Sequence, residues 1–438
     1  MAGAEGMDGS LCVSCFGKYR DNGGSREAWF SAVPSVNRMD VIVKGEKMKK
    51  IFKGLLVSAM AVVMTASMAM AGELSVVTSQ VDSNLTEIQE APADESVQEA
   101  PVEESIQEEQ TTEAVGNTNP LTGEDGYSDE AVNHRPVAVM INNHPDSYPQ
   151  YNIGQADVIF EFVVEHNLTR FLAVFADYAN VPYLVSVRSY RYYFPAVSSG
   201  FDAIYVHWGA DNTKMDYYNS LNLDSYDGMS NTYLFGRDQE RLDAGYALEH
   251  TSCLYGYLLP DQLAADGKRT TLKDEYLGEA FNFVPFGTVR VPEEMTVNFA
   301  NIEYGQQSTQ FTYNESTGLY EKFANDNPQI DGISGEQLTF ENVLILYTEI
   351  SARDDYPEAD RKNLDVFGGL DKDYAVGYYL TEGHAEQIRW AKADESSRLK
   401  FYDMDGNEIT INRGKSYITY TYADSAELSD TIPEAYIQ

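Results

Sequence analysis

Residues 135–145 read RPVAVMINNHP, and the run from Val137 to Ile141 is continuously apolar. A run this short predicts a strand buried on both faces of its sheet, because a half-exposed strand would alternate apolar and polar residues. Similar strands are expected at 157–165, 169–176, 181–187 and 202–206, with helical segments up to Gly200 and from Thr213 to Leu221. Strands that alternate with helices indicate an α/β layer with some parallel pairing.

The pattern changes to strands and turns beyond about residue 290, after a short helix and turn at 260–277. Further strands are expected at 296–304, 309–313, 319–323, 338–350, 374–380, 385–391, 399–402, 408–411 and 416–422. Gly and Asn or Asp turns between them indicate mainly antiparallel pairing. The sequence therefore predicts an α/β N-terminal domain with a mixed sheet and helices, residues 119–285, and a mainly antiparallel β C-terminal domain, residues 290–424.

The N-terminal part of the sequence predicts a secretory signal peptide. From Met48 it has a lysine-rich segment, an apolar run from Leu55 and an Ala-Met-Ala pattern that ends at Ala71. This predicts a signal peptide at 48–71, cleaved after Ala71, rather than a membrane-spanning helix, which needs ~20 apolar residues. A signal peptide works at the N-terminus, so we expect residues 1–47 to be a mis-assigned upstream extension. The mature protein is then secreted or cell-surface, with no integral membrane span.

A charged segment follows the signal peptide. Residues 73–115 contain 12 acidic residues and no Lys, Arg or aromatic residue. Such a segment cannot bury enough apolar surface to offset its ordering entropy, so 72–118 is predicted to be a disordered acidic linker. The whole chain has 31 Lys and Arg against 69 Asp and Glu, of which 22 and 51 remain from residue 119 onward. This excess of acids argues against a nucleic-acid partner and against docking to an anionic membrane.

Several polar residues follow the predicted strands, where ligands of α/β sheets tend to bind. They are Asn142, Asn143, His144, Arg188, Ser189, Arg191, His207 and Asp211. Ser189 can cap the following helix, which would place free amides and two guanidinium groups around a phosphate or carboxylate. Pro195 argues against this, since six positions into such a helix it removes a backbone bond. The candidate anion site comprises Arg170, Arg188, Ser189, Arg191 and His207.

Three carboxylates suggest another role for the arginines, in which they form ion pairs within the protein instead of binding a ligand anion. Asp157, Glu161 and Glu165 share a parity in their predicted strand, so they are expected on one acidic face. The arginines would then neutralise this face across the sheet. If residues 166–168 form a tight hairpin, Glu165 lies opposite Arg170 as a cross-strand pair.

Other motifs give weaker indications of a functional site. His250 and Cys253 suggest a Cys/His nucleophile, but neighbours in sequence rarely have the required geometry. Residues 403–408 resemble the start of a calcium loop without its terminal Glu, and a hairpin turn at Asp405-Gly406 is preferred. The six histidines show no zinc spacing, and we expect no metal and no cofactor. Cys253 is the one cysteine after the signal peptide, so no internal disulfide is expected.

Several motifs together resemble the YerB-like lipoproteins, a bacterial family built from the N- and C-terminal parts of domain of unknown function 3048. They are the segments 119–123, 135–143, 155–161, 169–171, 187–191, 203–207, 340–346 and 402–409. The resemblance covers about 119–422 and implies a two-domain envelope protein without supplying a reaction. Members usually carry a lipidated cysteine directly after the signal peptide, whereas this chain has Gly72 there. We therefore expect a released protein, or one held by a partner, rather than a lipid-anchored one.

Two functions are compatible with these features. The first is a non-enzymatic binding or scaffolding protein of the cell envelope, with a cell-wall or other anionic glycan as ligand. The alternative is an enzyme acting on an anionic envelope glycan or lipid-linked pyrophosphate. Its Arg170, Arg188 and Arg191 would hold phosphate, and Asp157 or Glu161 would act as base or magnesium ligand. Arginines and acids gathered in one cleft would favour the enzyme, and arginines saturated by ion pairs would favour the scaffold.

Overall fold

The computed structural model describes residues 116–355 and 359–437. The predicted upstream extension, the signal peptide and the linker up to residue 115 lie outside the described residues, so these remain predictions. The last residues assigned to the linker are described. Asn117–Thr118 form strand β1, which pairs antiparallel with β2, Asp125–Tyr127. The folded region therefore begins slightly before residue 119.

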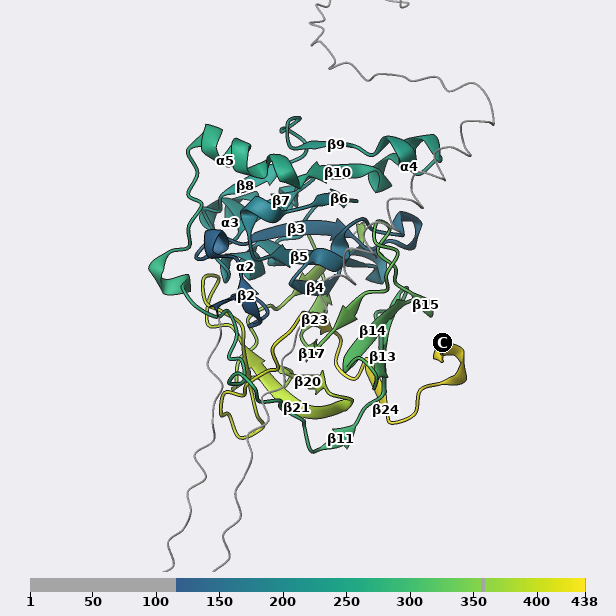
Figure 1. Ribbon diagram of the computed structural model, residues 1–438. Coiled ribbons are helices and arrows are strands. Elements are labelled where there is room, and N and C mark those ends of the chain that lie inside the picture. The colour runs from purple at the N-terminus through teal and green to yellow at the C-terminus, as the bar shows by residue number, and fades with distance from the viewer. Residues whose placement is uncertain (1–115, 356–358, 438) are drawn as a thin grey trace, which may run out of the picture. The chain divides into compact units, whose positions relative to one another are not determined.

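One sheet of 11 strands passes through both halves of the chain (Figure 1). From the N-terminal half it takes β3 (Val137–Asn142), β4 (Val158–Val163), β5 (Thr169–Phe175), β7 (Ile204–His207) and β8 (Ser225–Asp227). From the C-terminal half it takes β11 (Met295–Thr296), β17 (Asn342–Tyr347), β20 (Val376–Thr381), β21 (His384–Ala391), β22 (Lys400–Tyr402) and β23 (Ser416–Thr421). The order is β11-β21-β20-β17-β23-β4-β5-β3-β7-β8, with β22 beside β21. Strands β4 and β23 pair in parallel and so join the two halves.

A second sheet, of six strands, comes entirely from the C-terminal half. Its strands are β12 (Phe299–Glu303), β13 (Ser308–Asn314), β14 (Leu319–Ala324), β15 (Asn327–Pro328), β16 (Thr339–Phe340) and β24 (Ala426–Ser429). All of its pairs are antiparallel. Ile302 and Phe311 of this sheet share an apolar core with Ile345 and Tyr417 of the large sheet.

Helices and small sheets complete the described residues. The α-helices are α2 (Tyr193–Ser199), α3 (Met215–Ser220), α4 (Gln239–Asp243) and α5 (Leu259–Asp266). The 3-10 helices are η1 (Asp129–Ala131), η2 (Pro145–Ser147), η3 (Ile153–Gln155), η4 (Glu165–Asn167), η5 (Tyr178–Asn180), η6 (Asn212–Lys214), η7 (Leu248–His250), η8 (Gly256–Leu258), η9 (Asp274–Tyr276) and η11 (Glu434–Tyr436). The small sheets are β6 (Tyr183–Val185), β10 (Ser252–Tyr255) and β9 (Phe235–Arg237), and the pair β18 (Ile350–Ala352) and β19 (Lys362–Leu364).

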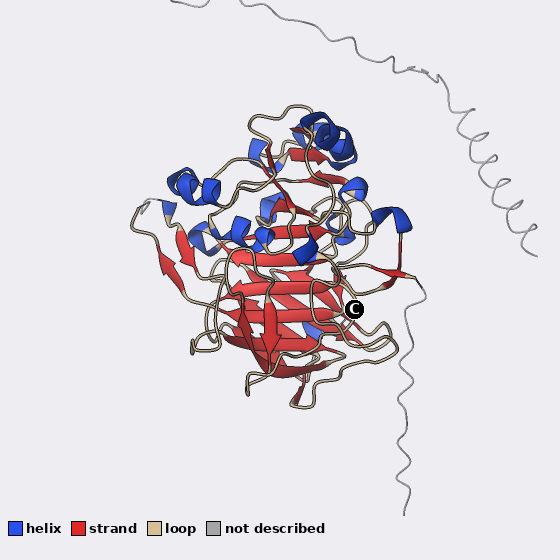
Figure 2. Ribbon diagram, turned by 90° about the vertical axis from the view of Figure 1, so that its left-hand side faces the viewer, coloured by secondary structure: helices blue, strands red, loops and turns tan. Residues whose placement is uncertain are grey.

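The predicted fold class is confirmed. The N-terminal domain has a mixed sheet with few helices, and the C-terminal domain is mainly antiparallel, with its strands gathered at the lower end in Figure 2. Within the described part of the chain, no helix is both long and apolar enough to cross a membrane.

Strand β3 shows why the continuously apolar run became a central strand. All six of its residues are buried. Ala138 and Met140 point into one apolar core, while Val139 and Ile141 point into a second core on the other face. A polar side chain on such a strand has no access to water and needs a buried partner. This requirement determines the surroundings of Glu161 on β4, described below.

Three local predictions differ from the structure. The strand expected at 181–187 is the three-residue β6, which lies in a small sheet rather than in the large one. Residues 408–411 form isolated bridges instead of a strand. Helix α2 begins at Tyr193, so Pro195 occupies its first turn, where the missing N–H costs no helical hydrogen bond.

Candidate anion-binding cleft

The three arginines proposed from the sequence line one cavity of about 420 Å³. Arg170 is the second residue of β5, and Arg188 and Arg191 belong to the segment between β6 and α2. The cavity is also lined by Asn142, His144, Glu165, His166, Thr169 and Arg361, among others. We call this site the arginine cleft. It lies where β3 and β4 end and β5 begins, because these antiparallel neighbours bring those ends to one edge of the sheet.

Among the described residues, Glu165 is the one carboxylate lining the arginine cleft. It forms a short ion pair with Arg191 Nε, and lies 3.6 Å from Arg170 Nη2 and 3.5 Å from Arg361 Nε. Burial alone would raise the pKa of Glu165, but the positive charges of Arg170 and Arg191 outweigh it and hold that pKa at about 2. Glu165 lies in the 3-10 turn η4, and Arg170 faces Phe162 across the ladder. The two residues therefore meet as an ion pair, but not as the predicted cross-strand neighbours.

Ser189 contacts the arginines instead of capping a helix. Arg170 Nη1 donates to the Ser189 carbonyl at 2.7 Å and to Ser189 Oγ at 3.1 Å. Arg191 Nη1 donates to the same hydroxyl at 3.4 Å and to the Tyr190 carbonyl at 2.6 Å. The cap of α2 is Tyr192, which makes no side-chain capping bond. The predicted role of Ser189 changes accordingly, because it orients two guanidinium groups.

Arg188 differs from the other arginines of the cleft. Among the described residues its guanidinium has no hydrogen-bond or ion-pair partner, and its Nε is buried without one. Burial lowers the pKa of Arg188, while the charge of Glu249 opposes this shift. Arg188 also lines a second cavity next to the cleft. An arginine keeps its charge in proteins, so this half-buried cation lacks a counter-charge at hydrogen-bond distance among the described residues.

Two histidines lie beside Arg188. The rings of His144 and His250 stack with their centroids 5.3 Å apart. Burial, followed by the charges of His144 and then Arg188, lowers the pKa of His250, although Glu249 opposes this. Together with Asp146, the two rings place possible ligand atoms within 4.8 Å of one another.

The hydrogen bonds of these histidines argue against a metal ion. His144 Nδ1 accepts from the Asp146 amide at 3.1 Å. Asn142 Oδ1 accepts from the His144 amide at 3.1 Å, so its Nδ2 is the group that lies 2.9 Å from His250 Nδ1. Both Nδ1 lone pairs are therefore in use, and each neutral ring carries its proton on Nε2. Two N–H groups beside an arginine suit an anion better than a cation.

His207, the fifth residue of the predicted site, lies elsewhere. It is buried at the end of β7, with Nδ1 3.1 Å from the Gly209 carbonyl and Nε2 3.3 Å from the Tyr218 hydroxyl. Burial lowers the pKa of His207 to about 4, against the attraction of Asp227. It lines neither the arginine cleft nor the adjoining cavity. His207 packs with Tyr190 and Tyr218 and has a structural role.

The expected acidic face is not formed. Asp157 precedes β4 and accepts from Asn119 Nδ2 at 2.8 Å and from the Ala176 amide at 2.7 Å, and burial raises its pKa. Glu161 is fully buried on the side of the strand that faces the six-stranded sheet. Glu165 alone reaches the arginine cleft. The three carboxylates are separated because Glu161 lies in β4, whereas Asp157 and Glu165 lie outside it. The alternation of side chains along a strand therefore does not place Asp157 and Glu165 on the same face as Glu161.

Glu161 is the centre of a buried hydrogen-bond network. Its Oε2 accepts from Tyr304 at 2.7 Å, from Thr309 at 3.0 Å and from Tyr417 in a shorter bond. Its Oε1 accepts from Thr169 Oγ1 at 2.6 Å and from Asn143 Nδ2 at 2.9 Å. Five donors saturate this carboxylate, so it is not available as a base or as a metal ligand.

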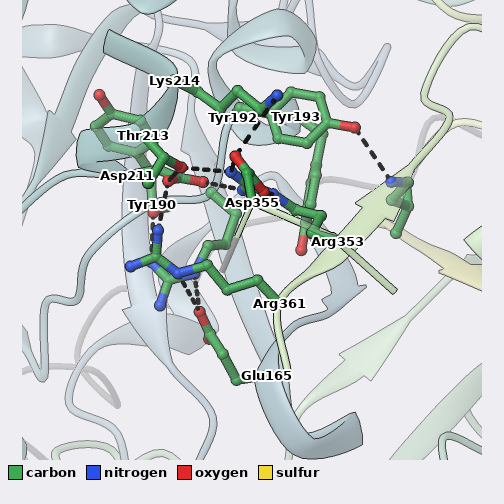
Figure 3. A network of polar contacts seen from close by, with 12 residues as sticks. Glu165, Tyr190, Tyr192, Tyr193, Asp211, Thr213, Lys214, Arg353, Asp355 and Arg361 are labelled. Carbon is green, nitrogen blue, oxygen red and sulfur yellow. Dashed lines mark hydrogen bonds and ion pairs between the residues drawn. The ribbon is translucent and has the colours of Figure 1, made fainter. Parts of the chain in front are cut away.

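Two arginines of the C-terminal half were not predicted from the sequence: Arg361 lines the cleft, and Arg353 shares the partner Asp211 with it. Arg353 Nη1 donates to Asp211 Oδ2 at 2.6 Å, and Arg361 Nη1 donates to Asp211 Oδ1 at 2.7 Å (Figure 3). Figure 3 also shows Arg361 reaching Glu165. Arg353 also pairs with the neighbouring Asp355 at 2.7 Å, but the partners of both arginines in the N-terminal half are at least 140 positions away, so no local pattern connects them with the site.

Comparison with protein families matches two stretches of this chain. Residues 121–256 match the N-terminal domain, and residues 300–418 the C-terminal domain, of a protein of unknown function, DUF3048. The chain belongs to the DUF3048 family. A DUF3048 relative from Bacillus subtilis (strain 168), named "Putative lipoprotein YerB", is 28% identical over 312 residues, which make up 68% of this chain and 84% of the relative. The predicted resemblance to YerB-like proteins is thus confirmed.

A solved structure supports the shared fold. The crystal structure of the YerB protein from Bacillus subtilis superposes with a TM-score of 0.60 at 23% identity. The match covers 72% of this chain and 99% of that chain. At this identity the similarity establishes the fold of the DUF3048 protein and carries no information about a reaction.

Proposed function

We propose that this DUF3048 protein is an exported binding protein of the bacterial cell envelope, whose arginine cleft holds an anionic group of its ligand. Export is supported by the predicted signal peptide at 48–71 and by the name of the Bacillus relative. A cell-wall or other anionic glycan is the ligand class that fits this location.

The state of Arg188 carries the proposal. Arg170, Arg191 and Arg361 all have an ion pair with Glu165, whereas Arg188 has none with any described residue. Glu165 in the cleft and Asp211, which pairs with Arg361, are fewer than the four guanidinium groups, so the described part of the cleft has an excess of positive charge. This excess is local, since the chain from residue 119 onward has 51 acids against 22 Lys and Arg. A bound anion supplies the missing counter-charge and accepts charge-assisted hydrogen bonds.

The enzymatic alternative is not supported by the positions of its proposed bases. Asp157 and Glu161 line neither the cleft nor the adjoining cavity, and both are hydrogen-bonded elsewhere. Glu165 has a pKa of about 2, because the attraction of Arg170 and Arg191 exceeds the effect of burial, and it is a weak base near neutral pH. His144 carries its proton on Nε2 when neutral, as argued above, so it is a donor. These groups bind an anion without activating a nucleophile.

Calorimetric titration of the purified chain with phosphate, pyrophosphate and galacturonate tests the proposal. The variant is Arg188→Gln, which removes a charge without breaking an ion pair. Loss of a charge-assisted contact costs about 1.5–3 kcal/mol, or roughly a 10- to 150-fold weaker affinity. Arg389→Gln is the matched control, because Arg389 lies on β21 and its Nη1 donates at 3.3 Å to the Leu370 carbonyl. We expect this control to bind within twofold of the parent.

Two results contradict the proposal. One is the absence of binding heat with every anion on the parent protein. The other is an unchanged affinity in a folded Arg188→Gln variant, with folding checked by circular dichroism.

A further inference from the structure

A larger cavity adjoins the arginine cleft. Its volume is about 640 Å³, and Arg188 lines both spaces. We call it the Trp208 hollow, after the residue that follows β7. Its walls include Trp208, Asp227, Met229, Arg237, Leu248 and Glu249. A ligand bound to Arg188 through an anionic group therefore has room to extend into this hollow.

The charge of the Trp208 hollow differs from that of the cleft. Arg188, Arg237, Asp227 and Glu249 all line the hollow, so its formal charges cancel, although neither carboxylate forms an ion pair with Arg188. The cleft has Arg170, Arg191 and Arg361 in addition to Arg188, with Glu165 as the carboxylate among its described lining residues. The hollow therefore favours an uncharged part of the ligand, while the cleft favours its anionic group.

The walls of the hollow combine apolar surface with hydrogen-bonding groups. Met229 is 70% exposed and Leu248 is 59% exposed. The Arg237 guanidinium lies 4.3 Å above the Trp208 ring, and its Nη1 donates to the Leu248 carbonyl at 2.6 Å. Large exposed apolar side chains at a concave surface that also carries charged groups are typical of a binding site.

These walls are held in place before any ligand binds. Asp227 Oδ1 accepts from the Gly209 amide at 2.8 Å and from the Met229 amide at 2.9 Å. The Trp208 ring lies directly against Gly228, where an added Cβ would come within 2.5 Å of ring carbons. Preorganisation of this kind lowers the entropic cost of binding.

We propose that the ligand is a sugar phosphate, with its phosphate at Arg188 in the cleft and its neutral sugar ring in the Trp208 hollow. This assignment rests on the proposed function. A sugar ring has apolar C–H surface for the exposed Met229 and Leu248, and adjacent hydroxyls for carboxylate and guanidinium groups. An alkyl chain fits less well, since it would desolvate Asp227 and Arg237 without offering them hydrogen bonds.

Titration of the full chain with glucose 1-phosphate, inorganic phosphate, octyl phosphate and glucose tests the assignment. We expect glucose 1-phosphate to bind at least tenfold more tightly than inorganic phosphate or octyl phosphate. Phosphate binding that gains nothing from the sugar would overturn the assignment and leave the proposed function intact. Tighter binding of octyl phosphate would assign the hollow to an apolar chain instead. No binding by any of the anions would reject both proposals.

Two variants locate the sugar. Asn212→Ala and Met229→Ala change exposed side chains of the hollow, and neither side chain has a hydrogen bond to a described residue, so the fold does not depend on them. We expect both to lose at least fivefold in affinity for glucose 1-phosphate and to bind inorganic phosphate as the parent does. Wild-type sugar-phosphate affinity in both variants would show that the ring lies outside the hollow.

Discussion

Arg353 and Asp211 form an ion pair of 2.6 Å in which neither side chain is more than 1% exposed. Arg353 follows β18 in the C-terminal half, while Asp211 follows β7 in the N-terminal half. The same aspartate also binds Arg361 at 2.7 Å, and Arg361 in turn reaches Glu165 in the cleft. One wall of the arginine cleft is thus built from both halves of the chain.

Asp211→Asn should destabilise the fold by about 3–5 kcal/mol, because it removes the buried carboxylate that Arg353 and Arg361 share and leaves Arg353 only its more exposed partner Asp355. Chemical denaturation measures the free energy of unfolding. The control is Glu408→Gln, which breaks the exposed 2.7 Å pair with Lys400 and should cost less than about 1 kcal/mol. Equal effects in the two variants would contradict a buried role for Asp211.

Glu161→Gln should lower the free energy of unfolding by about 2–4 kcal/mol, since an amide N–H would face hydroxyl donors such as Tyr304 and Thr169. The folded fraction should bind anions as the parent does. Denaturation and calorimetry on one preparation separate these effects. A stable variant that loses anion binding would instead return Glu161 to the candidate site.

Lys322 should make stability depend on pH above neutrality. It is fully buried, and burial lowers its pKa to about 8 in the folded protein, against an ordinary value of 10.5. The folded state therefore holds the proton less tightly than the unfolded state does. The stability linked to Lys322 is present above pH 10.5 and is lost as the pH falls from there through 8.

Lys322→Met should remove that dependence. The difference in unfolding free energy between parent and variant should change by up to about 3 kcal/mol between pH 8 and 10.5, with the parent gaining as the pH rises. Denaturation curves at several pH values measure it. Lys400→Met, at an exposed lysine, is the control. A difference that is constant over this range would show that Lys322 has an ordinary pKa.

Cys253 should resist alkylation in the native protein. It is fully buried, and burial raises the pKa of its thiol, so little thiolate is exposed near neutral pH. His250 is engaged with Asn142 and His144, and no contact joins it to Cys253 within the described chain. Peptide mapping after iodoacetamide treatment should show labelling of Cys253 only after denaturation. Rapid native labelling would revive the Cys/His hypothesis.

The exported protein should begin at Gly72, because Ala69 and Ala71 occupy the small-residue positions of a signal-peptidase site. Mass spectrometry of secreted material determines the N-terminus. A peptide from residues 1–47 in that material would reject both the cleavage site and the start at Met48.

The features that were predicted correctly from the sequence depend on residues close together along the chain. The strands near 137–141, 157–165 and 169–176 were found because their apolar runs reflect burial of each strand by itself. Arg170, Arg188 and Arg191 were placed together because they lie at the ends of neighbouring elements. The helix cap predicted at Ser189 and the site position predicted for His207 were wrong. The cap depends on where α2 starts, and the position of His207 depends on how β7 packs.

The sequence by itself determined the fold class, the family and the presence of cations near one edge of a sheet, because these depend on residue types at short spacing. Only the tertiary structure showed that β4 and β23 pair, with Val158 opposite Ser416, and so join the two halves of the chain in one sheet. It also decided that Glu165 and Asp211 neutralise the other arginines while Arg188 has no partner among the described residues. The physical reason is that a charge is free or paired according to its neighbours in space, and those neighbours come from strands and loops far apart along the chain.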